Sequence, residues 1–134
     1  MITLQGMAPL LQVYDMPTSL RFYCDLLDFQ VIQDSGNGNE SDWVLMKRDG
    51  IELMLNTAYE KPFRPTQADS KRIETHQDIT LYFGCPNIND MYNQLIDRGL
   101  SINKPQTTGY GWKAITFTDP DGYGLCFHWP EKDN

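Results

Sequence analysis

The residues most able to do chemistry are a thiol and an imidazole near the C-terminal end of the sequence. Cys126 and His128 lie two positions apart in the stretch 113–128, where polar and apolar residues alternate as in a half-buried strand. Side chains at this spacing share one face of a strand, so His128 could act as the base that activates a Cys126 thiolate. The alternatives are that Cys126 is a small apolar filler and that His128 hydrogen-bonds a ligand or lies at the strand end beside Trp129.

A single carboxylate, Glu52, lies in a second alternating segment, 51–56. It could serve as a lone general base in an apolar cleft, or it could be a solvated strand residue. Met54 shares its face. Gln12 and Asn56 lie on strands expected to line the same cleft, where amides give directional contacts without charge.

Aromatic residues are concentrated on or beside the predicted strands rather than in the predicted helices. A small organic ligand needs aromatic walls with a few polar groups, although aromatic residues also fill ordinary cores. The glycine-rich loop T-T-G-Y-G-W has the composition of a mobile rim, and His76 is more typical of the surface. The predicted ligand contacts are Gln12, Trp43, Met54, Asn56, Tyr82, Tyr110, Trp112, Cys126 and His128.

These residues lie on two similar halves. In the first half, strands are expected at 7–14, 29–34, 43–46 and 51–56, with a helix after the cap Asp15. In the second, strands are expected at 78–85 and 100–103 and in the hairpin 113–128, with a helix after the cap Asn87. Asp15 and Asn87 are 72 positions apart, as are the turn glycines Gly50 and Gly122. The order βαβββ therefore occurs twice, and two such modules would pair around a shared cleft.

The segment 57–77 between the modules is polar, has mixed charges and contains Pro62 and Pro65. It is predicted to be a linker or a flap. A connection of this length favours a segment that covers a site or crosses to a partner chain.

Composition narrows the class of protein. The chain of 134 residues is expected to form one domain, with modules at about 7–56 and 78–129. A formal net charge of −7 and only scattered basic residues argue against a nucleic-acid partner. Three cysteines without a C-x-x-C spacing favour a reducing compartment, and no apolar stretch is long enough to span a membrane. A cytoplasmic location is expected.

The sequence resembles the vicinal oxygen chelate superfamily, which includes glyoxalase I, bleomycin- and fosfomycin-resistance proteins and extradiol dioxygenases. The resemblance implies an α+β fold of tandem βαβββ modules forming a curved, open barrel-like mixed sheet, often completed in a homodimer. The motifs that carry it are Leu11-x-Val13-x-Asp15, Ser19-x-x-Phe22-Tyr23-x-x-Leu26-Leu27-x-Phe29, Leu81-Tyr82-Phe83, Met91-Tyr92-x-x-Leu95-x-x-x-Gly99 and Phe117-x-Asp119-Pro120-Asp121-Gly122-Tyr123.

In metal-using members of this superfamily, the first and last strands of each module each contribute one ligand to a divalent cation that chelates two substrate oxygens. Those positions fall on Ala8, Thr80, Cys126 and either Glu52, by local similarity, or Met54, by spacing. Such a set is unsuited to a hard-oxygen or iron site, so no cofactor is expected and a divalent metal is disfavoured.

Three functions are consistent with the sequence. The first is a metal-free binding protein for a small aromatic or hydrophobic compound, like the bleomycin-resistance branch, with an acidic charge that attracts cations. The second is a lyase, isomerase or dioxygenase of the glyoxalase kind that uses Glu52. The third is a regulatory module with a vestigial cleft.

Overall fold

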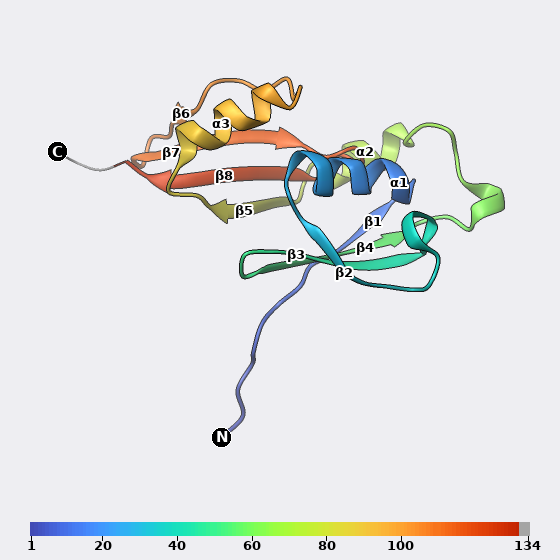
Figure 1. Ribbon diagram of the computed structural model, residues 1–134. Helices are drawn as coiled ribbons and strands as arrows, with labels where there is room; N and C mark the ends of the chain where they lie inside the picture. The colour runs from blue at the N-terminus through green and yellow to red at the C-terminus, as the bar shows by residue number, and fades with distance from the viewer. Residues whose placement is uncertain (132–134) are drawn as a thin grey trace. The chain divides into compact units, whose positions relative to one another are not determined.

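The computed structural model describes residues 1–131 and divides the chain into two compact units, which are treated separately below (Figure 1). Unit 1 covers Met1–Ala68 and unit 2 begins at Asp69. Each unit contains one four-stranded mixed sheet with strands in the order βαβββ along the chain. The predicted α+β class and the tandem βαβββ repeat are thus confirmed.

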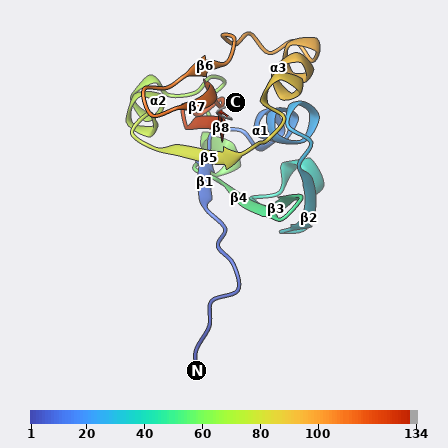
Figure 2. The ribbon, with the colours of Figure 1, turned by 90° about the vertical axis from the view of Figure 1, so that its left-hand side faces the viewer.

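The sheet of unit 1 consists of β1 (Leu10–Val13), β4 (Ile51–Thr57), β3 (Trp43–Arg48) and β2 (Gln30–Asp34), in that spatial order (Figure 2). β1 runs parallel to β4, whereas the other two pairs are antiparallel. Between β1 and β2 the chain forms α1 (Met16–Leu20), which continues as the π-helix η1 (Arg21–Leu26). A 3-10 turn, η2 (Gly38–Glu40), follows β2.

The sheet of unit 2 has the same topology. Its spatial order is β5 (Thr80–Gly84), β8 (Gly124–Pro130), β7 (Trp112–Thr118) and β6 (Gln106–Thr107). β5 and β8 are parallel, and the remaining pairs are antiparallel. The helix α3 (Ile88–Asp97) lies between β5 and β6 in the chain and packs on β7 and β8. It ends before Gly99, which has φ +91°, as expected for the glycine after a helix.

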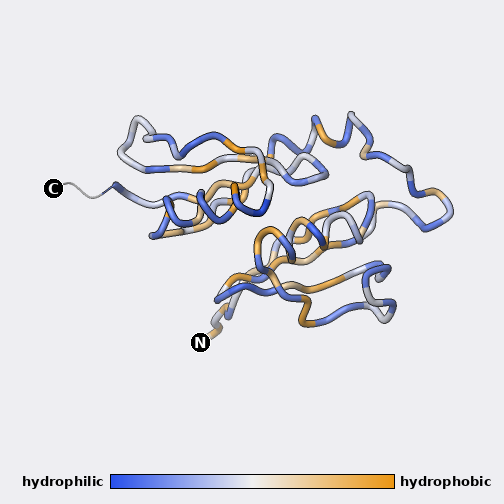
Figure 3. Tube along the Cα trace, turned by 45° about the horizontal axis from the view of Figure 1, so that its top comes forward, coloured by the Kyte–Doolittle hydropathy of each residue, from blue (hydrophilic) through white to orange (hydrophobic). Residues whose placement is uncertain are grey.

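Alternation along the strands gives each sheet one apolar face, and the helix of the same unit supplies further buried side chains. Hydrophobic residues lie mainly in the strands and in α1, while the loop after β2 is hydrophilic (Figure 3). In unit 1 the core comprises Leu11, Val13, Val44, Met46, Leu53 and Leu55 from the strands, with Met16, Leu20, Tyr23 and Leu27 from the helical segment. In unit 2 it comprises Phe83, Ile115, Leu125 and Phe127 from the strands, with Ile88 and Leu95 from α3.

Asp15 begins the first helix as predicted. Its Oδ2 accepts a hydrogen bond from the Thr18 backbone N–H at 3.1 Å and from the Thr18 hydroxyl at 2.6 Å. Asn87 also occupies the N-cap position of α3, but its side chain makes no capping hydrogen bond.

Two predicted strands differ from the structure. The strand expected at 7–14 is shortened to Leu10–Val13, because Pro9 lacks an N–H and contributes only its carbonyl, which accepts from Met54 N at 2.8 Å. The strand expected at 100–103 is wrong. Leu100 N instead donates to Leu95 O at the end of α3, and the short β6 begins only after Pro105.

The segment 57–77 contains more structure than a polar linker suggests: a 3-10 turn, η3 (Lys61–Phe63), and the helix α2 (Ser70–His76). In unit 1, Arg64 Nη1 lies 3.2 Å from Asp15 Oδ1 and 3.0 Å from Glu40 Oε2. In unit 2, α2 packs against the β7–β8 turn, where Arg72 Nη1 is 3.6 Å from Asp121 Oδ1. Both ends of the segment are therefore anchored, each within its own unit.

Candidate functional site

The face of the unit 1 sheet opposite its apolar core is called the unit 1 open face, and it carries all five residues predicted there. The strand register places Gln12, Asn56 and Trp43 in one row across β1, β4 and β3. Leu10, Met54 and Leu45 form the next row, and Glu52 stands opposite Lys47 in the row after that. The result is a half-buried surface of amides, a thioether and an indole.

The polar groups of the unit 1 open face are already partly paired. Asn56 Nδ2 donates to Gln12 Oε1 at 3.3 Å and to the Thr57 carbonyl at 3.2 Å. Lys47 directly opposite Glu52 forms a cross-strand pair of opposite charge, which is a favourable arrangement on an antiparallel sheet. A lone carboxylate works best as a general base when it lies in an apolar pocket. Glu52 has Lys47 as its neighbour instead, so its surroundings do not favour that role.

The corresponding surface of unit 2, the unit 2 open face, carries Tyr82, Trp112, Cys126 and His128. Tyr82, Cys126 and Thr116 form one row across β5, β8 and β7, and Gly84, His128 and Ala114 form the next. Thr80, Gly124 and Thr118 form a third row. No Asp, Glu, Lys or Arg occurs in these three rows.

Three rings on the unit 2 open face form a cluster, defined here as Tyr82, His128 and Trp112. The His128 ring lies 5.0 Å from the Tyr82 ring, at an interplanar angle of 65°. On its other side it stacks on Trp112, with centroids 4.4 Å apart and an interplanar angle of 30°. The sequence indicated each of these residues separately, whereas the contacts among them emerge only from the pairing of three strands.

Cys126 lies at the centre of the unit 2 open face but is only 3% exposed. Burial raises the pKa of its thiol, and the hydrogen bond from Thr116 opposes this shift only in part. The Thr116 hydroxyl donates to Sγ at 3.9 Å, and Sγ donates to the Phe127 carbonyl at 3.9 Å. These hydrogen bonds and the raised pKa are not those of an activated thiolate, and the pairing of Cys126 with His128 as nucleophile and base stays a hypothesis.

The strand registers fix which residues correspond in the two modules. Leu10 pairs with Met54 in unit 1, and Tyr82 pairs with Cys126 in unit 2, so both pairs are related by the 72-residue offset. Met54 is therefore the internal counterpart of Cys126. Glu52 corresponds instead to Gly124, which pairs with Thr80.

This correspondence tests whether the residues fit the divalent metal of the superfamily. The positions are Ala8, which has no donor atom, the Met54 thioether, the Thr80 hydroxyl and the Cys126 thiol. Taking Glu52 in place of Met54 adds one carboxylate. A divalent cation of the magnesium, manganese or iron class needs several carboxylate, imidazole or carbonyl ligands, and this set does not fit it. Within residues 1–131, no three His, Cys, Asp or Glu side chains are grouped so that they could hold a metal ion.

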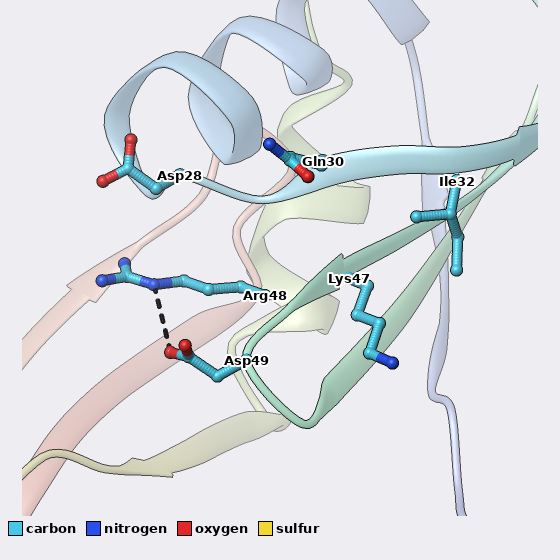
Figure 4. A pocket seen from close by; sticks show the side chains of 6 residues that line it. All are labelled: Asp28, Gln30, Ile32, Lys47, Arg48 and Asp49. Carbon is cyan, nitrogen blue, oxygen red and sulfur yellow. Dashed lines mark ion pairs between the residues drawn. The ribbon is translucent and has the colours of Figure 1, made fainter.

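A pocket of about 380 Å³ in unit 1 lies apart from the unit 1 open-face residues above, except for Lys47 (Figure 4). Its charged groups are largely engaged in holding the fold. Arg48 Nη1 donates to the Leu27 carbonyl at 2.7 Å, and its Nε lies 3.7 Å from Asp49 Oδ2. Arg48 thereby satisfies a carbonyl at the end of the helical segment, which is a structural role.

One predicted site residue, Tyr110, lies outside both open faces, and so does His76, which was expected at the surface. Tyr110 is 68% exposed at the tip of a turn in which Gly111 N donates to the Thr108 carbonyl at 3.1 Å. His76 is in α2, where its ring stacks on Tyr123 at 4.0 Å and its Nδ1 donates to the Asp121 carbonyl at 2.7 Å.

Sequence reasoning missed several open-face residues, although period-two alternation from the residues it did find would have located them. They are Leu10, Leu45 and Lys47 in unit 1, and Ala114, Thr116 and Thr118 in unit 2.

Tandem βαβββ modules with one helix-covered and one open sheet face define a known class of α+β protein. Residues 6–127 match the family model described as the Glyoxalase/Bleomycin resistance protein/Dioxygenase superfamily. The chain belongs to this superfamily, as its resemblance to vicinal oxygen chelate proteins implied. Comparison with the sequences of curated proteins gave no significant match.

Solved structures support the same fold. The protein SMU.1112c is 26% identical, with a TM-score of 0.71 over 95% of this chain and 100% of that one. A glyoxalase/bleomycin resistance protein/dioxygenase from Nocardioides is 16% identical, with a TM-score of 0.72 over 100% and 89% of the two chains. A bleomycin-binding protein complexed with bleomycin is 17% identical, with a TM-score of 0.68 over 96% and 100%. In the described part of the chain, no helix is both long and apolar enough to cross a bilayer.

Proposed function

We propose that this protein binds a small aromatic or hydrophobic compound on its open sheet faces and does so without the divalent metal of its superfamily. The observation that carries the proposal is the composition of the unit 2 open face, where three clustered rings lie among hydroxyl groups and no carboxylate or ammonium group. Small-molecule sites combine aromatic walls with a few polar groups in this way.

The donor set supports binding rather than metal-assisted chemistry. A position without a donor, a thioether, a hydroxyl and a thiol offer little to a hard cation. The bleomycin-binding protein of similar fold is an example of this architecture in complex with a small molecule. Function depends on the site rather than on the fold, so the residues of the open faces carry the proposal here.

Catalysis by Glu52 receives less support. The carboxylate stands opposite Lys47 on the neighbouring strand, so its nearest cross-strand neighbour is a cation. The proposal therefore assigns Glu52 to a polar pair on the unit 1 open face and does not assign it to a catalytic step.

The test is a panel of aromatic, aromatic cationic and aliphatic compounds, screened by thermal shift and measured by isothermal titration calorimetry. A ligand that binds only the folded state raises the melting temperature as its concentration increases. At a ligand concentration of a hundred times Kd, it adds about 2.7 kcal/mol to the free energy of unfolding. We expect aromatic compounds to give saturable binding and aliphatic compounds of equal size to bind more weakly. A panel in which no compound binds would refute the proposal.

A further inference from the structure

On the unit 2 open face, small residues beside His128 leave room for two aromatic rings to contact it. His128 stands in a strand row between Gly84 and Ala114, which have no side chain and a single methyl group. Tyr82 and Trp112, one row away on either side, therefore reach the imidazole diagonally and contact it from opposite directions. Diagonal contacts of this kind are within reach of aromatic side chains on a sheet.

One ring of the cluster is fixed through its backbone, and another is exposed to solvent. Trp112 is fixed at its backbone, because its N–H donates to Thr108 Oγ1 at 3.1 Å and its carbonyl accepts from Thr108 N at 2.7 Å. Tyr82 is nevertheless 59% exposed, although it lies in the interior of β5. An anchored Trp112 and an exposed Tyr82 on either side of His128 provide a stacking surface, and exposed aromatic surfaces commonly mark binding sites.

The charge of this face determines what can stack there. Its polar groups are the hydroxyls of Thr80, Thr116, Thr118 and Tyr82, the imidazole of His128, the Cys126 thiol and, from the edge strand β6, the Gln106 amide. A cationic ligand would find no carboxylate among them, and an anionic ligand would find no lysine or arginine. Hydroxyl and imidazole groups do match a ligand that both donates and accepts hydrogen bonds.

We infer that the Tyr82–His128–Trp112 cluster is the ring-binding subsite of this protein and that it takes an uncharged planar aromatic ring with a hydrogen-bonding substituent, such as a phenol or a neutral heteroaromatic compound. The inference rests on the proposed function and narrows it to one unit and one ligand class. It also departs from the expectation that the net acidic charge selects cations.

Naphthol is a suitable probe, with a naphthyl trimethylammonium compound as the cationic analogue and decalinol as the saturated one. We expect calorimetry to give naphthol the highest affinity. Tyr82→Leu and Trp112→Leu should each weaken naphthol binding about three- to tenfold, which corresponds to the loss of one aromatic contact. Phe63→Leu at an exposed position in η3 and Tyr110→Leu at the exposed turn are matched controls and should leave the affinity within about twofold.

Wild-type protein provides a second measurement that does not depend on folded variants. The chain has only two histidines. His76, in α2, stacks on Tyr123 and hydrogen-bonds the Asp121 carbonyl. Naphthol should shift the imidazole NMR signals of His128 and leave those of His76 unchanged, with the signals assigned through His76→Asn.

The outcomes separate this inference from the proposed function. Tighter binding of the cationic or saturated probe would overturn the ligand class. Naphthol binding that keeps its affinity in both Tyr82→Leu and Trp112→Leu, or that leaves the His128 signals unmoved, would overturn the subsite while the proposed function stands. If none of the wider aromatic panel binds, both fail.

Discussion

Met54 and Cys126 show how much a single strand register can decide. From the sequence, the fourth ligand position falls on Glu52 by local similarity, or on Met54 by spacing. The register places Met54 opposite Leu10 and Cys126 opposite Tyr82, which makes the two sulfur residues equivalent. Register depends on pairing between distant strands, and local sequence similarity does not determine it.

Cys126 and His128 illustrate a second limit. Their spacing correctly predicts a shared face, but it says nothing about which neighbours occupy the space around them. Thr116 and the two aromatic rings come from other strands. The prediction of a shared face thus succeeded from local periodicity, whereas the contacts that bear on the nucleophile hypothesis come only from the tertiary structure.

Asp15 gives a prediction at the scale of one residue. Partial burial would raise its pKa, but hydrogen bonds from Thr18 and the nearby Arg64 guanidinium outweigh this and hold the pKa below its usual value. A carboxyl with a lowered folded-state pKa contributes stability at neutral pH, and the contribution is lost as the pH falls through that pKa. Asp15→Asn retains a capping side chain and removes the charge.

We therefore expect Asp15→Asn to lower the free energy of unfolding by about 0.5–1 kcal/mol at neutral pH. The difference from wild type should begin to shrink as the pH falls below about 3.9, the ordinary pKa of an aspartate, and should disappear only below the lowered pKa of folded Asp15. Urea unfolding at several pH values measures both quantities, with Asp42→Asn, at an exposed position, as control. A difference that persists or grows on acidification would contradict this assignment.

At the scale of elements, the two helices with apolar periodicity were found, and α2 was missed. Its sequence, S-K-R-I-E-T-H, has one apolar residue and no helical period. The helix is instead stabilised by capping and by contact with the β7–β8 turn, through Arg72 on Asp121 and His76 on Tyr123. Asp121 is buried in this contact, so the β7–β8 turn is a packing surface.

Gly122 tests this contact directly. Its φ is +89°, and a Cβ added there would lie within 3 Å of backbone atoms of Ile73 in α2. We expect Gly122→Ala to destabilise the protein by about 2–3 kcal/mol, because the backbone conformation and the helix contact are both disfavoured. Thermal and urea denaturation measure the loss.

The repeat supplies the matched control. Gly50 is the counterpart of Gly122 in unit 1, but no atom lies within 4 Å of the position of its Cβ. In that turn, Asp49 rather than the glycine has positive φ. Gly50→Ala should therefore change stability by no more than about 0.5 kcal/mol. Equal losses at the two glycines would refute the packing of α2 on the turn.

At the scale of the whole molecule, the internal repeat was the most informative feature of the sequence. It predicted two βαβββ modules, and the 72-residue offset agrees with the strand registers of both units. The homodimer and the cytoplasmic location stay predictions, since they depend on surfaces and surroundings outside a single chain. The open faces could be predicted by alternation, while the aromatic cluster required the pairing of β5, β8 and β7.

The central claim is that this member of the superfamily binds an aromatic ligand without a metal. The most direct test is calorimetry with the best aromatic ligand of the panel, using protein dialysed against a chelator and the same protein supplemented with nickel, zinc, manganese or iron. We predict affinities that agree within about twofold, or about 0.4 kcal/mol. Binding that requires a metal, together with stoichiometric metal that is lost in Glu52→Ala, would contradict the claim.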